Sequence, residues 1–151
     1  MTPRDPRWAD LAARAERMRK RSHAPYSRYR VGAALLTTKG VALGCNVENA
    51  SYPLCMCAEA GAVAGAVARG WTDFVAIAVA TEGPEAGSPC GACRQILAEF
   101  GLDTSVGLVV GGAVVKVVSM RELRPFAFNA ERLPSAESAP RRPRATPAPR
   151  R

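Results

Sequence analysis

The sequence has few aromatic residues, a single histidine and no long apolar run. Aromatic side chains make up 6% of its 151 residues, which is few for a protein that stacks the bases of single-stranded nucleic acid on aromatic rings. The apolar stretch 106–118 is broken by three glycines and by Lys116. No segment approaches the roughly 18 consecutive apolar residues of a membrane span. The composition therefore argues against a membrane protein and against a base-stacking surface.

No disulfide framework is indicated either. The five cysteines are odd in number and all lie between residues 45 and 93, a pattern that suits thiolate chemistry in a reducing compartment. The first eight residues carry charged side chains and no apolar core, so no secretory signal is expected. We therefore expect a cytoplasmic protein.

The net charge of +8 is unevenly distributed. Residues 135–151 hold five arginines and one glutamate, a net charge of +4, among prolines and alanines. Such a composition cannot form a hydrophobic core. The whole chain is 48% apolar and 23% charged, which is typical of a globular protein. We expect one globular domain over residues 1–134 and a disordered basic tail over residues 135–151.

Hydrophobic periodicity predicts alternating helices and strands. Apolar residues three and four positions apart predict a first helix, and Gly70 and Gly101 mark the ends of two others. The predicted helices span residues 8–18, 57–69 and 90–100, and the predicted strands span 31–38, 41–47, 74–80, 106–110 and 113–118. In this order, helices cover the faces of a sheet. The prediction is an α/β fold, a three-layer α/β/α sandwich with one five-stranded mixed sheet.

Two smaller features accompany these elements. The second predicted strand leaves into a polar loop, residues 46–53, whose side chains can hydrogen-bond the hydroxyls of a ligand. Gly61 and Gly65 lie four residues apart on the second predicted helix. Since each glycine costs a soluble helix about 0.5–1 kcal/mol, we expect another backbone to approach closely there.

Cys57, Cys90 and Cys93 form a candidate set of metal ligands. The Cys90-x-x-Cys93 pair alone occurs in structural zinc sites, redox dithiols and metal clusters. A redox dithiol would not need a third thiol at Cys57. Structural zinc takes four protein ligands, whereas catalytic zinc takes three and leaves one position for water. The sequence therefore predicts one catalytic Zn²⁺ per chain.

Glu59 supplies a proton carrier next to this zinc site. If Cys57 starts a helix, its thiolate and the Glu59 carboxylate can face one cavity. Zinc lowers the pKa of its bound water to about 7, and a glutamate that is not a metal ligand moves protons in the zinc nucleobase deaminases. Three thiolates give the zinc centre a net charge of −1. We expect Arg94, beside Cys93, to draw charge off the thiolates; the alternative is an ordinary surface arginine.

Over residues 8–130 the chain resembles the small cytidine deaminase family. The matching stretches are YS at 26–27, VGAAL at 31–35, GCNVENASY at 44–52, CAE at 57–59, SPCGACRQ at 88–95 and LRPFAF at 123–128. The resemblance implies a hydrolase of pyrimidine salvage, a homotetramer that deaminates cytidine and 2′-deoxycytidine. Zinc-bound hydroxide would attack C4 with Glu59 as the proton shuttle, and residues 1–134 would be the catalytic domain.

The resemblance also implies the substrate contacts. Tyr29 would lie against the pyrimidine, at a position where the family usually has phenylalanine. Asn46 and Glu48 would hold the ribose 3′-hydroxyl, and the carbonyl of Ala58 would accept a hydrogen bond from the 4-amino group. Phe128 would reach the pocket of a neighbouring subunit.

Two positions depart from the family pattern. Ala60 stands where an arginine often hydrogen-bonds the zinc thiolates, and residues 53–56 include Cys55, a fourth thiol near the site. The alternatives are a deaminase of another aminated pyrimidine, such as blasticidin S or a free base, a nucleic-acid editor, and a purely structural zinc module. Asn46 and Glu48 favour a substrate that carries a ribose hydroxyl.

Overall fold

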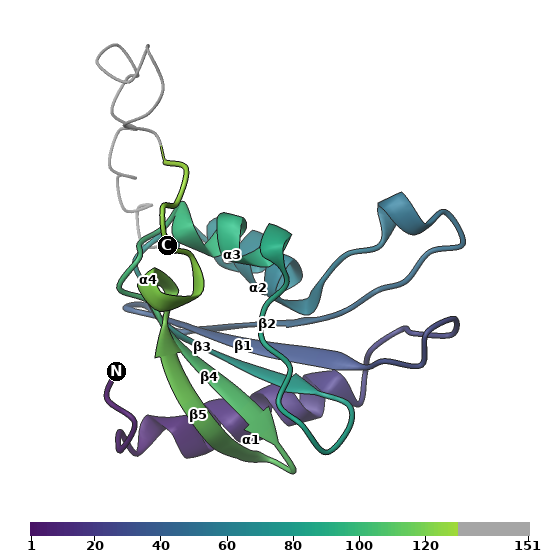
Figure 1. Ribbon diagram of the computed structural model, residues 1–151, viewed down its shortest axis with the longest axis horizontal. Helices are drawn as coiled ribbons and strands as arrows, with labels where there is room; N and C mark the ends of the chain where they lie inside the picture. Colours follow the sequence, from purple (N-terminus) through teal and green to yellow (C-terminus); the bar gives the residue numbers. More distant parts are fainter. Residues whose placement is uncertain (130–151) are drawn as a thin grey trace, which may run out of the picture.

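We describe residues 1–129 in a computed structural model, in which a single sheet is covered by helices on both faces (Figure 1). The elements are, in order, α1 (Arg7–Arg19), β1 (Val31–Thr37), β2 (Val41–Cys45), the 3-10 helix η1 (Tyr52–Leu54), α2 (Ala58–Val67), β3 (Phe74–Thr81), α3 (Gly91–Ala98), β4 (Ser105–Val110), β5 (Ala113–Ser119) and α4 (Met120–Leu123). All three predicted helices and all five predicted strands are present. The structure adds η1, which begins at the end of the predicted polar loop, and the short helix α4.

The sheet has the strand order β2-β1-β3-β4-β5. The β3–β4 pair is parallel and the other three pairs are antiparallel, so the predicted mixed sheet is confirmed. In the registers, Gly32 pairs with Cys45 and Val31 pairs with Thr81. The start of β1 therefore lies beside the ends of β2 and β3, at the end of the sheet where the loops after β2 and β3 begin.

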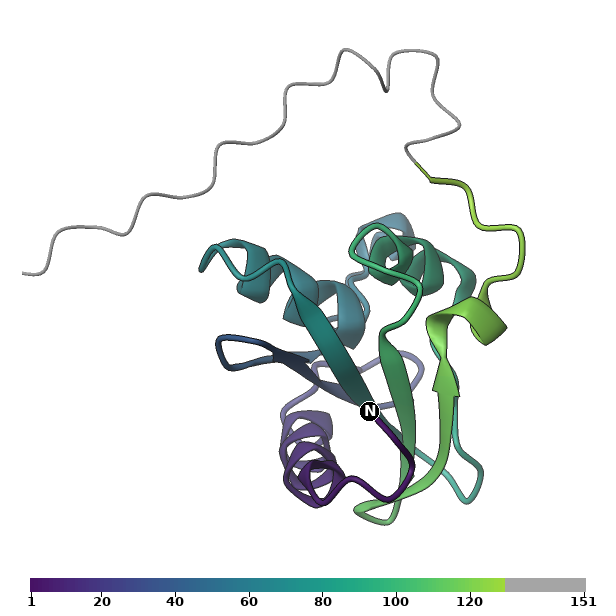
Figure 2. The same ribbon diagram turned by 90° about the vertical axis from the view of Figure 1, so that its left-hand side faces the viewer.

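The core lies in two layers, one on each face of the sheet. Successive side chains of a strand point to opposite faces, and Leu35, Ile77 and Val79 pack beneath α2 and α3 with Leu97. On the other face, alanines of β1 and β3 pack against Trp8 and its neighbours on α1. Figure 2 shows α1 and the α2–α3 pair on opposite sides of the sheet. The predicted three-layer sandwich is therefore confirmed.

A glycine of β2 lets α2 lie directly on the sheet. A Cβ atom added to Gly44 would lie 2.2 Å from the carbonyl oxygen of Ala58 and 2.5 Å from the nitrogen of Ala62. A Cβ on Gly61 would make ordinary contacts at 3.9 Å with the backbone of β2, and one on Gly65 would meet only the Arg69 guanidinium. The backbone of β2 therefore lies beside Gly61, as predicted, but at a distance that would also admit a side chain, and within this chain the residue that the contact requires is Gly44. A close approach at Gly65 stays a prediction.

Two expectations concern the chain as a whole. None of the helices within residues 1–129 has both the length and the apolar character needed to cross a membrane. The predicted basic tail, residues 135–151, lies outside the described residues.

Candidate metal centre and pocket

Three cysteines meet where two helices begin. Cys57 is the N-cap of α2, Cys90 is the N-cap of α3, and Cys93 lies in the first turn of α3. Their Sγ atoms all lie within 4.8 Å of one another, and those of Cys57 and Cys90 are 3.9 Å apart. Tetrahedral zinc with Zn–S bonds near 2.3 Å needs sulfurs about 3.8 Å apart. The three thiols therefore fit one zinc ion, as their spacing in the sequence predicted.

The surroundings of the cluster favour a thiolate. Helix N-termini carry positive partial charge and free N–H groups, which stabilise an ionised thiol. A hydrogen bond from Cys93 lowers the pKa of Cys57 to about 6. The same bond raises the pKa of Cys93, as does its burial.

Glu59 is a buried carboxyl beside the cluster. It is the second residue of α2 and only 4% exposed. Burial raises its pKa, while hydrogen bonds from its own backbone amide and from Cys93 partly oppose that rise. The side chain therefore lies next to the thiols in a setting that favours proton uptake, as the two-residue spacing from Cys57 predicted.

A cavity of about 360 Å³ opens over Glu59 and the cysteines, which is large enough for a small molecule. Its walls combine apolar side chains with a few polar groups. They are formed by Ser27, Tyr29, Val31, Asn46, Val47, Glu48, Cys55, Met56, Cys57, Ala58, Glu59, Val79, Thr81, Ser88 and Cys90. The predicted contact residues Tyr29, Asn46, Glu48 and Ala58 all line it. Phe128 is 53% exposed and does not belong to this set.

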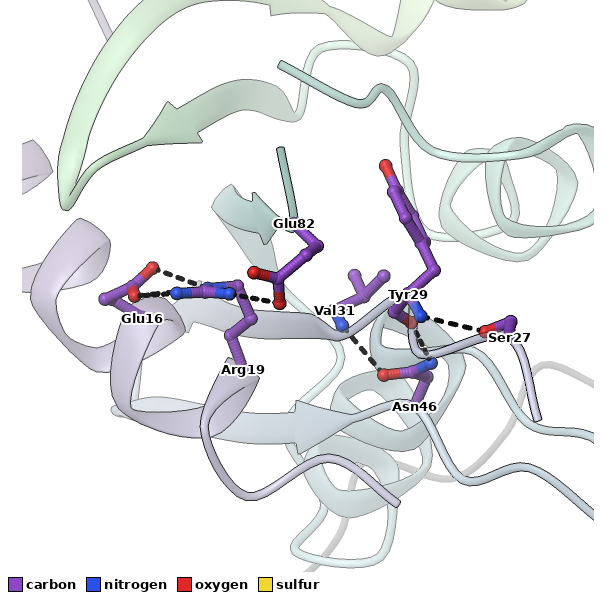
Figure 3. A network of polar contacts seen from close by, with 7 residues as sticks. All are labelled: Glu16, Arg19, Ser27, Tyr29, Val31, Asn46 and Glu82. Atoms are coloured by element: carbon purple, nitrogen blue, oxygen red, sulfur yellow. Dashed lines mark hydrogen bonds and ion pairs between the residues drawn. The ribbon is translucent and has the colours of Figure 1, made fainter. Parts of the chain in front are cut away.

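Polar side chains at one end of the cavity form hydrogen bonds with the segment that leads into β1. Asn46 accepts a hydrogen bond from the Val31 amide (2.8 Å) and donates one to the Tyr29 carbonyl (2.9 Å), as Figure 3 shows. Glu48 accepts hydrogen bonds from the Tyr26 amide and from the Ser27 hydroxyl and amide. The Ser27 hydroxyl is the main cause of the lowered pKa of Glu48. Glu48 thus presents an ionised carboxylate.

The side chain of Arg94 makes its hydrogen bonds to oxygen atoms. Its guanidinium donates to the carbonyls of Pro89 (2.8 Å) and Leu123 (3.1 Å) and to the Ser88 hydroxyl (2.9 Å). All three of its side-chain nitrogens therefore bond oxygen atoms, and Arg94 joins the loop before Cys90 to the end of α4. Its role in tuning the charge of the thiolates stays a prediction that these contacts do not support.

Two other groups considered from the sequence, the Ala58 carbonyl and the Cys55 thiol, contact the backbone of their own chain. The carbonyl of Ala58 faces Gly44 of β2, so its predicted bond to an amino group stays a prediction. At the first position of a helix it is the N–H that lacks an intrahelical partner. The thiol of Cys55 bonds the backbone of Asn49 and does not join the metal cluster of the described residues.

Several residues of the pocket were missed from the sequence. Ser27 and Ser88 each lie in a stretch that matches the family, and both could have been proposed on that signal. Thr81 at the end of β3 and Met56 before Cys57 carry no such signal, because only the fold brings them to the cavity.

Comparison with known proteins agrees with this geometry. Residues 7–109 match the family model described as the cytidine and deoxycytidylate deaminase zinc-binding region. The chain is 45% identical over 123 residues to a cytidine deaminase of Halalkalibacterium halodurans, covering 80% of this chain and 93% of that protein. It is 42% identical over 130 residues to one of Sporosarcina psychrophila, covering 83% and 94%.

Solved structures give the same result. The crystal structure of cytidine deaminase from Burkholderia pseudomallei is 45% identical, covers 85% of this chain and 100% of its own, and superposes with a TM-score of 0.76. The cysteine cluster, the buried glutamate and these matches agree. The chain belongs to the cytidine and deoxycytidylate deaminase family.

Proposed function

We propose that this protein hydrolyses cytidine and 2′-deoxycytidine to uridine and 2′-deoxyuridine, releasing ammonia. One observation carries the proposal: the buried carboxyl of Glu59 and a three-thiol metal site share a cavity with the ionised carboxylate of Glu48. A metal-assisted hydrolysis needs the first two groups, and recognition of a ribose hydroxyl needs the third.

Cys57, Cys90 and Cys93 would hold the zinc ion. When bound, zinc supplies a Lewis acid that brings the pKa of a water molecule to about 7. With only three protein ligands, the site keeps the open position typical of catalytic zinc.

Glu59 moves the protons of the reaction. Its carboxylate takes a proton from the attacking water as the C4–O bond forms, and passes it to N3 of the pyrimidine. The carboxylate then takes the second proton from the new C4 hydroxyl and delivers it to the 4-amino nitrogen, so that the C4–N bond breaks, the C4 carbonyl forms and ammonia leaves. Burial of Glu59 keeps bulk water away from this transfer and favours the protonated form that the second step requires.

The cavity walls account for the choice of substrate. Tyr29, Val31 and Val79 supply flat and branched apolar surface for a pyrimidine ring. The Glu48 carboxylate can accept a hydrogen bond from the ribose 3′-hydroxyl, which cytosine lacks. A free base would leave this charged group without a ligand partner, so nucleosides are favoured over the bases.

The test is a substrate panel with the zinc-loaded full chain. Ammonia release is measured with cytidine, 2′-deoxycytidine, cytosine and blasticidin S. We expect kcat/KM to be highest for the two nucleosides, and Glu48→Gln to raise KM for cytidine while leaving the zinc content unchanged. Faster turnover of cytosine or blasticidin S than of either nucleoside would contradict the proposal, as would unchanged cytidine kinetics in Glu48→Gln.

We also propose a cytoplasmic homotetramer that acts in pyrimidine salvage, with residues 1–134 as the catalytic domain. Phe126 is fully exposed and Phe128 half-exposed, Gln95 donates a hydrogen bond to the backbone carbonyl of Phe128 (3.0 Å), and Phe128 does not line the cavity of its own chain. An aromatic side chain placed this way is available to the pocket of a second copy. Sedimentation velocity tests the assembly, and a fully active monomer would contradict it.

A further inference from the structure

The segment that carries Tyr29 into the cavity has an unfavourable backbone. Arg28 has a φ of +59°, in the left-handed region that residues with a Cβ atom seldom adopt. Such a conformation persists only where neighbouring groups hold it in place. Tyr29 follows directly, is 45% exposed and lines the cavity. Something other than core packing must therefore hold it.

Side chains bond both backbone groups of Tyr29. Its amide donates to the Ser27 hydroxyl (2.9 Å), and its carbonyl accepts from the Asn46 side chain (2.9 Å). The other end of the Asn46 amide accepts from the Val31 amide (2.8 Å), and the Asn46 backbone nitrogen donates to the Val31 carbonyl (3.1 Å). Asn46 lies just beyond the end of β2, and its side chain extends the pairing of β1 and β2 past the last strand residue (Figure 3).

We infer that Asn46 is a positioning residue: it fixes the pocket wall formed by Tyr29, independently of any contact with the ribose. The side-chain oxygen and nitrogen of Asn46 are each already bonded to the backbone on either side of Arg30. A ligand hydroxyl would have to share these atoms, whereas they already hold the Tyr29 wall in the protein without a ligand.

The consequence of losing Asn46 is confined to this wall. The carbonyl of Arg30 is held from the other side by the Glu82 amide (3.0 Å), and Glu82 is paired with Arg19 (2.6 Å). Val31 also remains paired with Thr81 of β3. An Asn46 variant therefore keeps its fold and its zinc site, while the Tyr29 backbone loses its anchor.

The kinetic test, which rests on the proposed deaminase activity, uses zinc-loaded Asn46→Ala with cytidine and 3′-deoxycytidine. A residue that only binds the 3′-hydroxyl would affect cytidine alone. We expect kcat/KM to fall about tenfold or more for both substrates, as loss of two backbone hydrogen bonds predicts, with part of the fall in kcat. A loss seen only with cytidine would overturn the inference. Asn49→Ala is the matched control, because within residues 1–129 the Asn49 side chain bonds only Ser51 in the same loop.

A second measurement does not depend on activity. Amide hydrogen exchange at Val31, followed by NMR in the zinc-loaded protein without substrate, should be about tenfold faster in Asn46→Ala than in wild type and unchanged in Asn49→Ala. Asn46→Asp keeps an acceptor for this amide and should restore its protection. Equal exchange in Asn46→Ala and wild type would overturn the inference even if the protein proves to be a cytidine deaminase. Faster exchange would support it even if cytidine is not turned over.

Discussion

Gly44 lies where α2 packs on β2, against the first turn of the helix that begins after the metal ligand Cys57. The carbonyl of Ala58 and the nitrogen of Ala62 occupy the space that a side chain at this position would need. Since both are backbone atoms of a helix, they cannot move aside singly. The position of the first zinc ligand and of Glu59 relative to the sheet therefore depends on a glycine in a different element.

Gly44→Ala should displace α2, lower the free energy of unfolding by about 1–3 kcal/mol and reduce the zinc bound per chain. Gly61→Ala is the control on the facing helix. Its added methyl group makes only ordinary contacts, so removing a helical glycine should raise stability by about 0.5–1 kcal/mol. Urea unfolding and metal analysis of the two proteins make the comparison. If Gly44→Ala were as stable and as rich in zinc as wild type, the close packing of α2 on Gly44 would be wrong.

The secondary-structure elements are also joined by side chains: Arg19 links helix α1 to the end of β3. Its guanidinium pairs with Glu16 on the same helix (2.5 Å) and with Glu82 just after β3 (2.6 Å). Arg19 and Glu16 are each about one-fifth exposed, so water screens the pairs only partly. Glu82 also bonds the Arg30 carbonyl. Arg19 and Glu82 thereby attach α1 to the loops around the cavity.

This network makes part of the stability depend on pH. The hydrogen bond from Arg19 lowers the pKa of Glu16 below its ordinary 4.5, so folding favours the ionised carboxylate. The contribution is fully present above about pH 4.5 and is lost as the pH falls through the lower pKa of the folded protein. Arg19→Met should therefore be less stable than wild type by about 0.5–1 kcal/mol at pH 7, and the difference should shrink in acid.

Urea unfolding of wild type and Arg19→Met from pH 7 to pH 3 measures that difference. Protonation of the cysteine ligands affects both proteins equally and cancels between them. A difference that stayed constant over this range would show that Arg19 acts through packing alone.

Prediction from sequence succeeded where a pattern depends on nearby residues. The apolar periodicity of α1 and the continuous apolar run of β3 reflect which faces are buried, and Cys57, Cys90 and Cys93 give the ligand count of a catalytic zinc. Contacts between distant segments were not predictable in this way. Neither the fit of α2 on Gly44 nor the contacts of Arg94 with Leu123 leaves a periodic signal, because each depends on which backbone atoms meet in the folded chain.

Across the whole molecule, the uneven distribution of charge favours an enzyme of free nucleosides over a nucleic-acid editor. Half of the net charge lies in residues 135–151, while every group proposed for the chemistry lies within residues 27–128. Deleting residues 135–151 should leave kcat/KM for cytidine within about twofold, because an uncharged nucleoside gains little from distant positive charge. Loss of cytidine turnover on truncation would contradict a tail that is dispensable for the reaction.

We propose that Glu59 moves protons and that three cysteines hold the zinc ion. The most direct measurement is zinc content together with cytidine turnover in wild type and in Glu59→Ala. We expect about one zinc per chain in both proteins, since three thiolates complete the protein ligands of a catalytic site. Turnover should fall at least about 10²–10⁴-fold in the variant. Loss of zinc in Glu59→Ala would make this residue a ligand, and retained turnover would remove it from the reaction; either result would contradict the mechanism.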